Sequence, residues 1–208
     1  MEYVKPIKRA MPLEFKDIFK HNQDWLKEKL DLDPDYFTKL SIKQTPSILY
    51  IGCCDSRVNP ESIIGASPGD MFVHRNVANL VLESDVNSKS AIAFALEQLK
   101  VKHIIVVGHY HCGGIEAAMS FKDYGTLNDW LENIRDEYQT YKEELDALGD
   151  GEKRNERLVE LNVLEQCKHI ANNPDFQKAQ KEYGVELHAF VFDLNTGKII
   201  DLEYEKIA

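Results

Sequence analysis

Three short, uninterrupted apolar runs constrain the fold of this chain more than any other feature. They lie at residues 47–53, 71–74 and 103–108, and each ends at polar or metal-ligating residues. Runs of this length without polar alternation are typical of strands buried on both faces, as in parallel sheets. Residues 87–100, between the second and third runs, carry apolar side chains at helical spacing. The order strand, helix, strand predicts right-handed parallel crossovers, with ligands bound at the carboxyl ends of the strands.

The rest of the chain is predicted to be mainly helical. Apolar residues recur at helical spacing over residues 12–31, 126–145 and 152–171. Residues 185–192 and 198–204 instead alternate around an Asn-Thr-Gly turn, which is typical of a hairpin. The predicted fold class is therefore α/β, with a mostly parallel β-sheet flanked by helices, an N-terminal helical arm and a C-terminal hairpin extension.

The chain shows no internal repeat and no low-complexity linker, so a single domain over residues 1–208 is the economical interpretation. Within it, residues 1–43 form the helical arm and residues 44–208 form the α/β core. The amphipathic arm is expected to pack on the body or on a partner subunit.

Composition excludes several classes of protein. The formal net charge of −10 argues against binding to nucleic acid or to anionic membranes, because such binding needs clustered Lys and Arg. No stretch approaches the about 18 apolar residues of a membrane span. Four cysteines are too few for a small disulfide scaffold, and two lie in metal-ligand contexts. A cytoplasmic location is the expectation, with an organellar address left open.

Two separated motifs supply ligands for a zinc ion. Cys53 ends the first apolar run, and His109 and Cys112 follow the third, three residues apart in a glycine-flanked turn. Thiolate and imidazole are preferred zinc ligands, and a catalytic zinc takes three protein ligands and leaves a fourth position for water. These three residues are the predicted metal ligands.

Asp55 and Arg57 follow Cys53 at steps of two, so in an extended chain they point to the same side. A bidentate ion pair between them would hold the carboxylate off the metal and orient it toward zinc-bound water. Zinc lowers the pKa of its bound water enough to give hydroxide at neutral pH. Asp55 and Arg57 are therefore the predicted catalytic residues.

The other cysteines and histidines have simpler expected roles. Cys54 faces away from Cys53 and is expected to be a buried small hydrophobe, with a four-ligand structural zinc site as the alternative. Cys167 shares its spacing with helix core positions and is expected to be structural. His111 is a proton relay, a turn residue or a surface imidazole. The remaining histidines are expected to be packed or hydrogen-bonded (His74, His188) or to lie at the surface or at element edges (His21, His103, His169).

The two motifs resemble those of the β-class carbonic anhydrases, which run Cys-x-Asp-x-Arg and, later, His-x-x-Cys. Here they stand as Cys53, Asp55 and Arg57 and as His109 and Cys112. The likeness extends to the segments 50–61, 68–79, 108–114 and 160–166. It covers most of the chain, from about residue 44 to the hairpin.

This resemblance implies a zinc-dependent carbonate dehydratase that reversibly hydrates carbon dioxide to bicarbonate and a proton. It implies one Zn²⁺ per subunit in a homodimer or homotetramer. Zinc-bound hydroxide would attack the carbon, while Asp55 accepts the hydroxide proton in a hydrogen bond and Arg57 keeps Asp55 ionised.

The resemblance also implies the substrate-binding residues. Gln44 would donate a hydrogen bond to a substrate oxygen, and the Gly113 amide would contribute a second donor. Phe72 and Val77, from the partner subunit, would wall a small apolar pocket for an uncharged linear molecule.

Some bacterial members of the family close the site by swinging the carboxylate onto zinc while bicarbonate occupies a pocket of Trp, Arg and Tyr. Asp55 would be the fourth ligand in such a closed state. The matching positions here are Tyr50, Arg75 and Phe192, so only the arginine is retained. These departures weaken the case for bicarbonate regulation, and Phe94 likewise replaces a frequent Tyr.

Two alternatives stay open from the sequence. One is hydrolysis of carbon disulfide or carbonyl sulfide on the same scaffold, because these linear molecules fit a similar cavity. The other is a non-catalytic, zinc-stabilised binding or sensor module in which four protein ligands close the site.

Overall fold

A computed structural model describes residues 14–120, 122–149 and 151–204 of the chain. Contacts divide the chain into two compact units, Met1–Gln44 and Thr45–Ala208. The single-domain interpretation stays a prediction, and each unit is described by itself.

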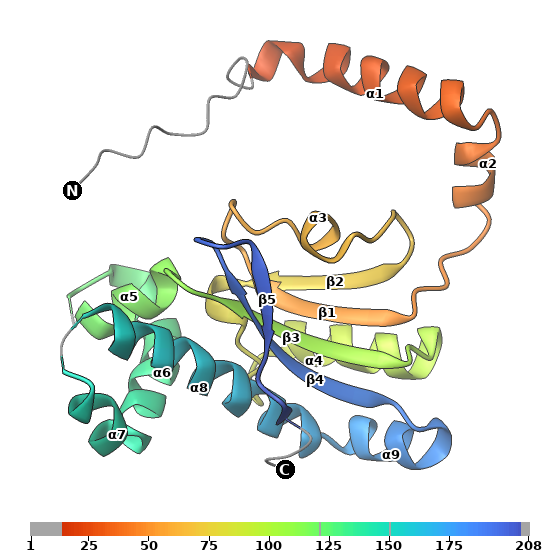
Figure 1. Cartoon of the computed structure of the whole chain (residues 1–208). Coiled ribbons are helices and arrows are strands. Elements are labelled where there is room, and N and C mark those ends of the chain that lie inside the picture. The colour runs from red at the N-terminus through yellow and green to blue at the C-terminus, as the bar shows by residue number, and fades with distance from the viewer. Residues whose placement is uncertain (1–13, 121, 150, 205–208) are drawn as a thin grey trace. The chain divides into compact units, whose positions relative to one another are not determined.

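The second unit is built on a five-stranded sheet with the strand order β2-β1-β3-β4-β5 (Figure 1). The strands are β1 (Ile48–Cys53), β2 (Met71–Asn76), β3 (His103–His109), β4 (Glu186–Asp193) and β5 (Lys198–Asp201). The first four pair in parallel, and β5 pairs antiparallel with β4. This confirms the predicted fold class and brings the carboxyl ends of β1 and β3 to the same edge of the sheet.

Helices flank this sheet. In the second unit they are α3 (Pro60–Ile64), α4 (Val86–Phe94), α5 (Gly113–Ser120), α6 (Asn128–Thr140), α7 (Lys142–Ala147), α8 (Glu152–Ala171) and α9 (Pro174–Tyr183). α8 packs directly on β3 and β4, and α5 and α6 pack against α8. The approach is close at Gly108, where a Cβ atom would lie 2.5 Å from Val163 Cγ2. Glycine therefore lets α8 lie against β3, beside the strand end that carries His109.

The core lies on both faces of the sheet. The larger cluster joins the sheet to α4, α5, α6, α8 and α9, and contains Leu49, Ile51, Ile104, Val106, Leu131, Val163 and Cys167. The smaller cluster on the other face contains Tyr50, Val58, Ile105, Val107 and Phe192. Alternate residues of β1 and β3 enter opposite clusters, as the double burial of their apolar runs predicts.

Local chemistry explains two helices that periodicity missed, α3 and α9. α3 begins after Asn59, whose side chain accepts the Ser62 N–H, and α9 begins after Asn173 in the same way. Both helices carry Pro in the first turn, and α3 is too short for a helical pattern to register. The predicted helix 87–100 is α4 continued by a π-helical turn, which ends at Lys100 in the left-handed region.

The first unit contains a short 3₁₀ turn (Phe15–Asp17), α1 (Ile18–Leu32) and α2 (Tyr36–Leu40). The predicted helix over residues 12–31 is therefore present, and its first two residues lie outside the described part. The rings of Trp25 and Phe37 meet edge to face with centroids 5.3 Å apart, which joins the two helices. No residue of α1 is buried. Among the residues that the structure describes, no helix is long and apolar enough to cross a bilayer.

Candidate metal centre

Two strand ends and one turn bring the predicted ligands together. Cys53 ends β1, His109 ends β3, and Cys112 lies in the turn before α5. Their ligand atoms all lie within 4.8 Å of one another, and the two sulfurs are 3.9 Å apart. All three residues are buried. Two soft sulfurs and one imidazole nitrogen at this spacing fit a zinc ion with an open coordination position.

The hydrogen bonding of His109 leaves one ring nitrogen free for a metal. Its Nδ1 lies 2.9 Å from the carbonyl oxygen of Tyr110, which can only accept, so Nδ1 carries the proton. The buried Nε2 is then a bare lone pair, and it has no hydrogen-bond partner among the described residues. A buried nitrogen without a partner is costly unless a cation binds it, and a backbone carbonyl is a common outer partner of a zinc-bound imidazole.

Backbone N–H groups surround both thiols. Cys112 precedes the first turn of α5, where the Gly114 and Ile115 N–H groups point at its sulfur. Cys53 accepts a hydrogen bond from Ala78 N–H at 3.4 Å. The contact with Cys112 lowers the pKa of the Cys53 thiol, whereas the same contact, together with burial, raises the pKa of Cys112. The donors suit sulfurs that carry negative charge.

Asp55 and Arg57 form the predicted bidentate pair. Arg57 Nε donates to Asp55 Oδ1 at 2.9 Å, and Nη2 donates to Oδ2 at 2.6 Å. The Arg57 backbone N–H also donates to Oδ1, and Nη2 reaches the carbonyl of His111. Asp55 Oδ2 lies 3.8 Å from His109 Nε2. The guanidinium lowers the pKa of the Asp55 carboxyl to about 2, so the carboxylate is ionised at neutral pH beside the ligands.

A strained turn beside the ligands is held by side chains that the sequence analysis missed. Ala78 and Asn79 adopt φ values of 63° and 52°, a region that non-glycine residues rarely occupy. Trp130 Nε1 donates to the carbonyl of Val77, and Asn162 Nδ2 donates to that of Ala78, both at 2.9 Å. These bonds orient the Ala78 N–H toward Cys53. The sequence did offer one sign of this support: Asn162 is a polar residue on the core face of a predicted helix.

The predicted substrate residues differ in where they lie in the chain's fold. Gly113 begins α5 and is exposed, and Val77 packs so closely on Gly114 that a Cβ there would lie 2.8 Å from Val77 Cγ1. Phe72 lies on β2 four residues before the strand end, about 13 Å along the strand, against the ring of Phe94. Gln44 is exposed in the first unit. Within the second unit, Gly113 and Val77 adjoin the ligand group, and Phe72 does not.

The three positions of the regulatory pattern lie on three strands, Tyr50 on β1, Arg75 on β2 and Phe192 on β4. Arg75 donates to the carbonyl groups of Cys53, Asp55 and Val58 at 2.8–2.9 Å and so fixes the loop that carries the carboxylate. Tyr50 and Phe192 are both buried in the smaller core cluster. Burial raises the pKa of Tyr50 well above its usual range.

Cys54 contradicts its expected role. It is exposed rather than buried. β1 ends at Cys53, and the next residue already leaves the sheet, with its N–H bound to the carbonyl of Asn76. Strand alternation therefore no longer directs this side chain into a core. Cys167 is fully buried, as predicted.

A cavity of about 250 Å³ adjoins Cys112. It is lined by His111, Ile115 and Val159 and by three acidic residues, Glu116, Glu152 and Glu156. His111 Nε2 lies 2.9 Å from Asn195 Nδ2 and 3.5 Å from Glu152 Oε1. His111 is thus a turn residue, with a φ of 57°, and its imidazole lies between the ligand turn and this acidic opening.

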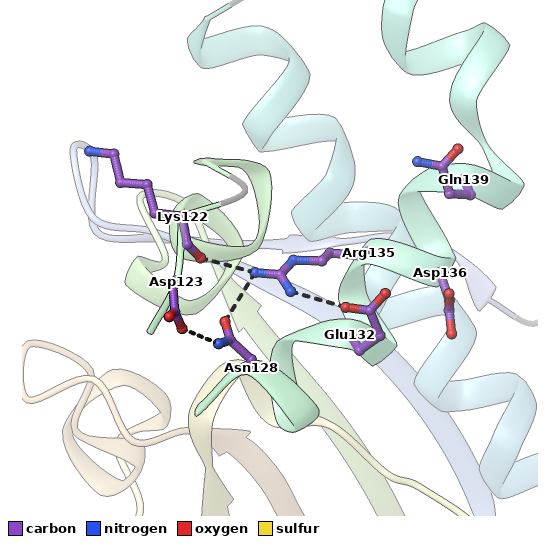
Figure 2. A pocket seen from close by; sticks show the side chains of 7 residues that line it. All are labelled: Lys122, Asp123, Asn128, Glu132, Arg135, Asp136 and Gln139. Atoms are coloured by element: carbon purple, nitrogen blue, oxygen red, sulfur yellow. Dashed lines mark hydrogen bonds and ion pairs between the residues drawn. The ribbon is translucent and has the colours of Figure 1, made fainter. Parts of the chain in front are cut away.

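A second cavity, of about 460 Å³, is lined by polar side chains that bind one another (Figure 2). Arg135 of α6 donates to Glu132, to Asn128 Oδ1 and to the carbonyl of Lys122, and Asn128 in turn binds Asp123. The charged groups of this cavity thus tie the loop after α5 to α6. That linkage holds α5, whose first turn borders Cys112.

Comparison with known proteins agrees with this geometry. Residues 48–199 match the family described as carbonic anhydrase. The chain is 45% identical over 202 residues to a carbonic anhydrase of Emericella nidulans, covering 97% of this chain and 89% of the relative. A β-carbonic anhydrase of Sordaria macrospora, from a study of two tetrameric enzymes, superposes with a TM-score of 0.88 at 40% identity, covering 91% and 96%. The Coccomyxa β-carbonic anhydrase, solved in complex with acetazolamide, gives 0.85 at 33% identity, covering 92% and 87%.

Proposed function

This chain belongs to the β-class carbonic anhydrases, and we propose from the geometry of its site how its residues carry the hydration of carbon dioxide. Its reaction converts carbon dioxide and water reversibly to bicarbonate and a proton, with zinc held by Cys53, His109 and Cys112. When bound, zinc supplies a Lewis acid that lowers the pKa of a water ligand toward about 7, an effect for which carbonic anhydrases are themselves the standard example.

The position of Asp55 carries the proposal. Its Oδ2 atom, 3.8 Å from His109 Nε2, lies where it can accept a hydrogen bond from the reacting water. This bond aims the oxygen lone pair of that water at the carbon of carbon dioxide. Asp55 is the catalytic residue in this scheme.

Arg57 acts through Asp55 and is the positioning residue. Its two side-chain bonds fix both carboxylate oxygens, and its bond to the His111 carbonyl ties the pair to the ligand turn. The ion pair keeps the carboxylate charged and prevents it from rotating freely. A fourth-ligand role for Asp55 would require both side-chain bonds to Arg57 to rearrange.

The substrate pocket is proposed to combine polar and apolar groups. Gly113 is an exposed residue in the first turn of α5, and its N–H is proposed as a donor for a substrate oxygen, with Val77 as an apolar wall. Phe72 is distant from the ligands of its own chain, which supports the expectation that Phe72 walls the site of a partner subunit. Gln44 is proposed as the second donor from the family resemblance.

We propose a homo-oligomer, either a dimer or a tetramer. The Sordaria macrospora relative comes from a study of tetrameric enzymes. α1 buries none of its residues and exposes six large apolar side chains: Ile18, Phe19, Trp25, Leu26, Leu30 and Leu32. A second copy of the chain would cover this apolar face. A reducing compartment such as the cytoplasm is proposed because all four cysteines are free thiols.

Stopped-flow hydration of carbon dioxide with the zinc-loaded enzyme tests the proposal. Asp55→Asn keeps the shape of the side chain but loses its charge, so we expect one zinc per chain and a rate lower by about a hundredfold or more. Asp129→Asn, an exposed carboxylate in the first turn of α6, is the matched control and keeps the wild-type rate. An Asp55→Asn enzyme of wild-type rate would remove Asp55 from the chemistry, and a wild-type rate equal to that of buffer would contradict the activity itself.

A further inference from the structure

A second group of potential metal ligands lies at the amino-terminal ends of β3 and β4. His103 Nδ1 is 3.2 Å from His188 Nε2 and 3.1 Å from Glu186 Oε2. His188 Nε2 is 3.5 Å from the same carboxylate oxygen. These three atoms thus form a compact triangle, which we call the amino-end cluster.

The register of the sheet builds this cluster. His103 pairs directly with Glu186, and His188 lies two residues further along β4 on the same face. The backbone at this point is fixed, because His103 N–H binds the carbonyl of Ser47 and Glu186 N–H binds that of Lys102. The imidazole of His188 also stacks on the ring of Phe190, with centroids 5.9 Å apart. The three side chains therefore project from a rigid part of the sheet.

While both imidazoles are neutral, hydrogen bonds cannot satisfy all three atoms of this triangle. Each facing ring nitrogen carries at most one proton, and the carboxylate can only accept. If His103 donates to His188, the lone pair of His188 Nε2 is already used, and no proton remains for its contact with Glu186. If both imidazoles donate to Glu186, their two N–H groups oppose each other. A central cation would satisfy all three lone pairs at once.

The distances fit such a cation. Ligand atoms about 2.1 Å from a common ion are about 3.0 Å apart in octahedral geometry and about 3.4 Å apart in tetrahedral geometry. The three observed separations, 3.1–3.5 Å, match these edges without movement of the backbone. We propose that His103, Glu186 and His188 bind a second divalent transition-metal ion, with Zn²⁺ as the reference ion.

The ligand set and its exposure define the kind of site. Two imidazoles and one carboxylate on one side of an ion leave the other coordination positions to water. The side chains of His103, Glu186 and His188 are 40%, 54% and 25% exposed, so an ion reaches them directly from solvent. Six residue steps along β3, about 20 Å, separate His103 from His109. The second ion is therefore independent of the catalytic one.

Isothermal titration of the one-zinc holoenzyme with ZnCl₂ tests the proposal. We expect one further equivalent per chain for the wild type, and binding weaker by about tenfold or more in Glu186→Gln and His188→Gln. Glu186 is mostly exposed, so its variant avoids the loss of packing that a change at His188 brings. His21→Gln, which removes an exposed imidazole from α1, is the control and keeps the second equivalent.

A zinc-edge anomalous difference map of zinc-soaked crystals then locates the ion, with a peak expected between His103 Nδ1 and His188 Nε2. Absence of a further equivalent in the wild type, or equal binding in both cluster variants, would overturn the proposal. Both variants should hydrate carbon dioxide at the wild-type rate, so failure of this inference is distinguishable from failure of the proposed function.

Discussion

The two ends of β3 carry two three-ligand groups that differ in burial. At the carboxyl end, Cys53, His109 and Cys112 are 5%, 1% and 2% exposed, and the free lone pair of His109 lies inside the protein. At the amino end, the amino-end cluster has half-exposed side chains that water can solvate. Each group has three ligands, but the difference in burial gives the two ions different roles. A buried site makes its ion part of the fold, whereas an exposed site holds an ion that exchanges with solvent.

Removal of a buried ligand is the strongest test of this contrast. In Cys112→Ala we expect zinc affinity to fall by more than about a hundredfold, since loss of an outer partner alone weakens metal binding by about 10- to 100-fold. Stability should fall with it, because metal binding and folding are coupled at a buried site. Zinc content by mass spectrometry and thermal unfolding measure both effects.

Cys54→Ala is the matched control, because it removes an exposed thiol next to a ligand. We expect it to retain its zinc and its activity. Full zinc occupancy in Cys112→Ala would take Cys112 out of the ligand set and break the comparison.

The rate of metal release sharpens the contrast further. Removing the buried ion requires local opening of the strand ends, and an opening cost of only about 2.7 kcal/mol slows release about a hundredfold. We therefore expect EDTA to remove the ion of the amino-end cluster at least about a hundredfold faster than the catalytic ion. A zinc-binding dye, followed alongside the loss of activity, resolves the two phases. A single phase for two equivalents would contradict the difference between the two ends.

Glu137 shows how burial alone changes the pKa of a carboxyl group, because it lies away from both ligand groups. Burial raises the pKa of Glu137 from 4.5 to about 8, although Gln166 donates to its Oε1 atom. The folded state therefore holds this proton more tightly than the unfolded state does. Its contribution to stability is complete below pH 4.5 and is lost as the pH rises to about 8.

Glu137→Gln removes this dependence and keeps an acceptor for Gln166. We expect the variant to gain about 2 kcal/mol over the wild type between pH 6 and pH 9, as measured by urea unfolding at both values. Glu132→Gln, an exposed glutamate on the same helix, is the control. A difference between Glu137→Gln and wild type that does not change with pH would show that Glu137 is solvated.

Local patterns were sufficient for much of the fold. Uninterrupted apolar runs predicted β1, β2 and β3, and helical spacing predicted α8 over its whole length. Periodicity could not find α3 and α9, because their starts are encoded by single capping side chains, Asn59 and Asn173, rather than by a repeated pattern. It also continued the alternation past the end of β1 and so misjudged Cys54.

The sequence by itself determined the chemistry of the catalytic end. Residue type and short spacing specify which sulfurs and which imidazole suit zinc, and the two-residue step from Asp55 to Arg57 specifies their ion pair. The tertiary structure alone decided which residues support that site, since Trp130 and Asn162 reach it from distant helices. It alone also formed the amino-end cluster, because the register between two strands far apart in sequence brings those ligands together.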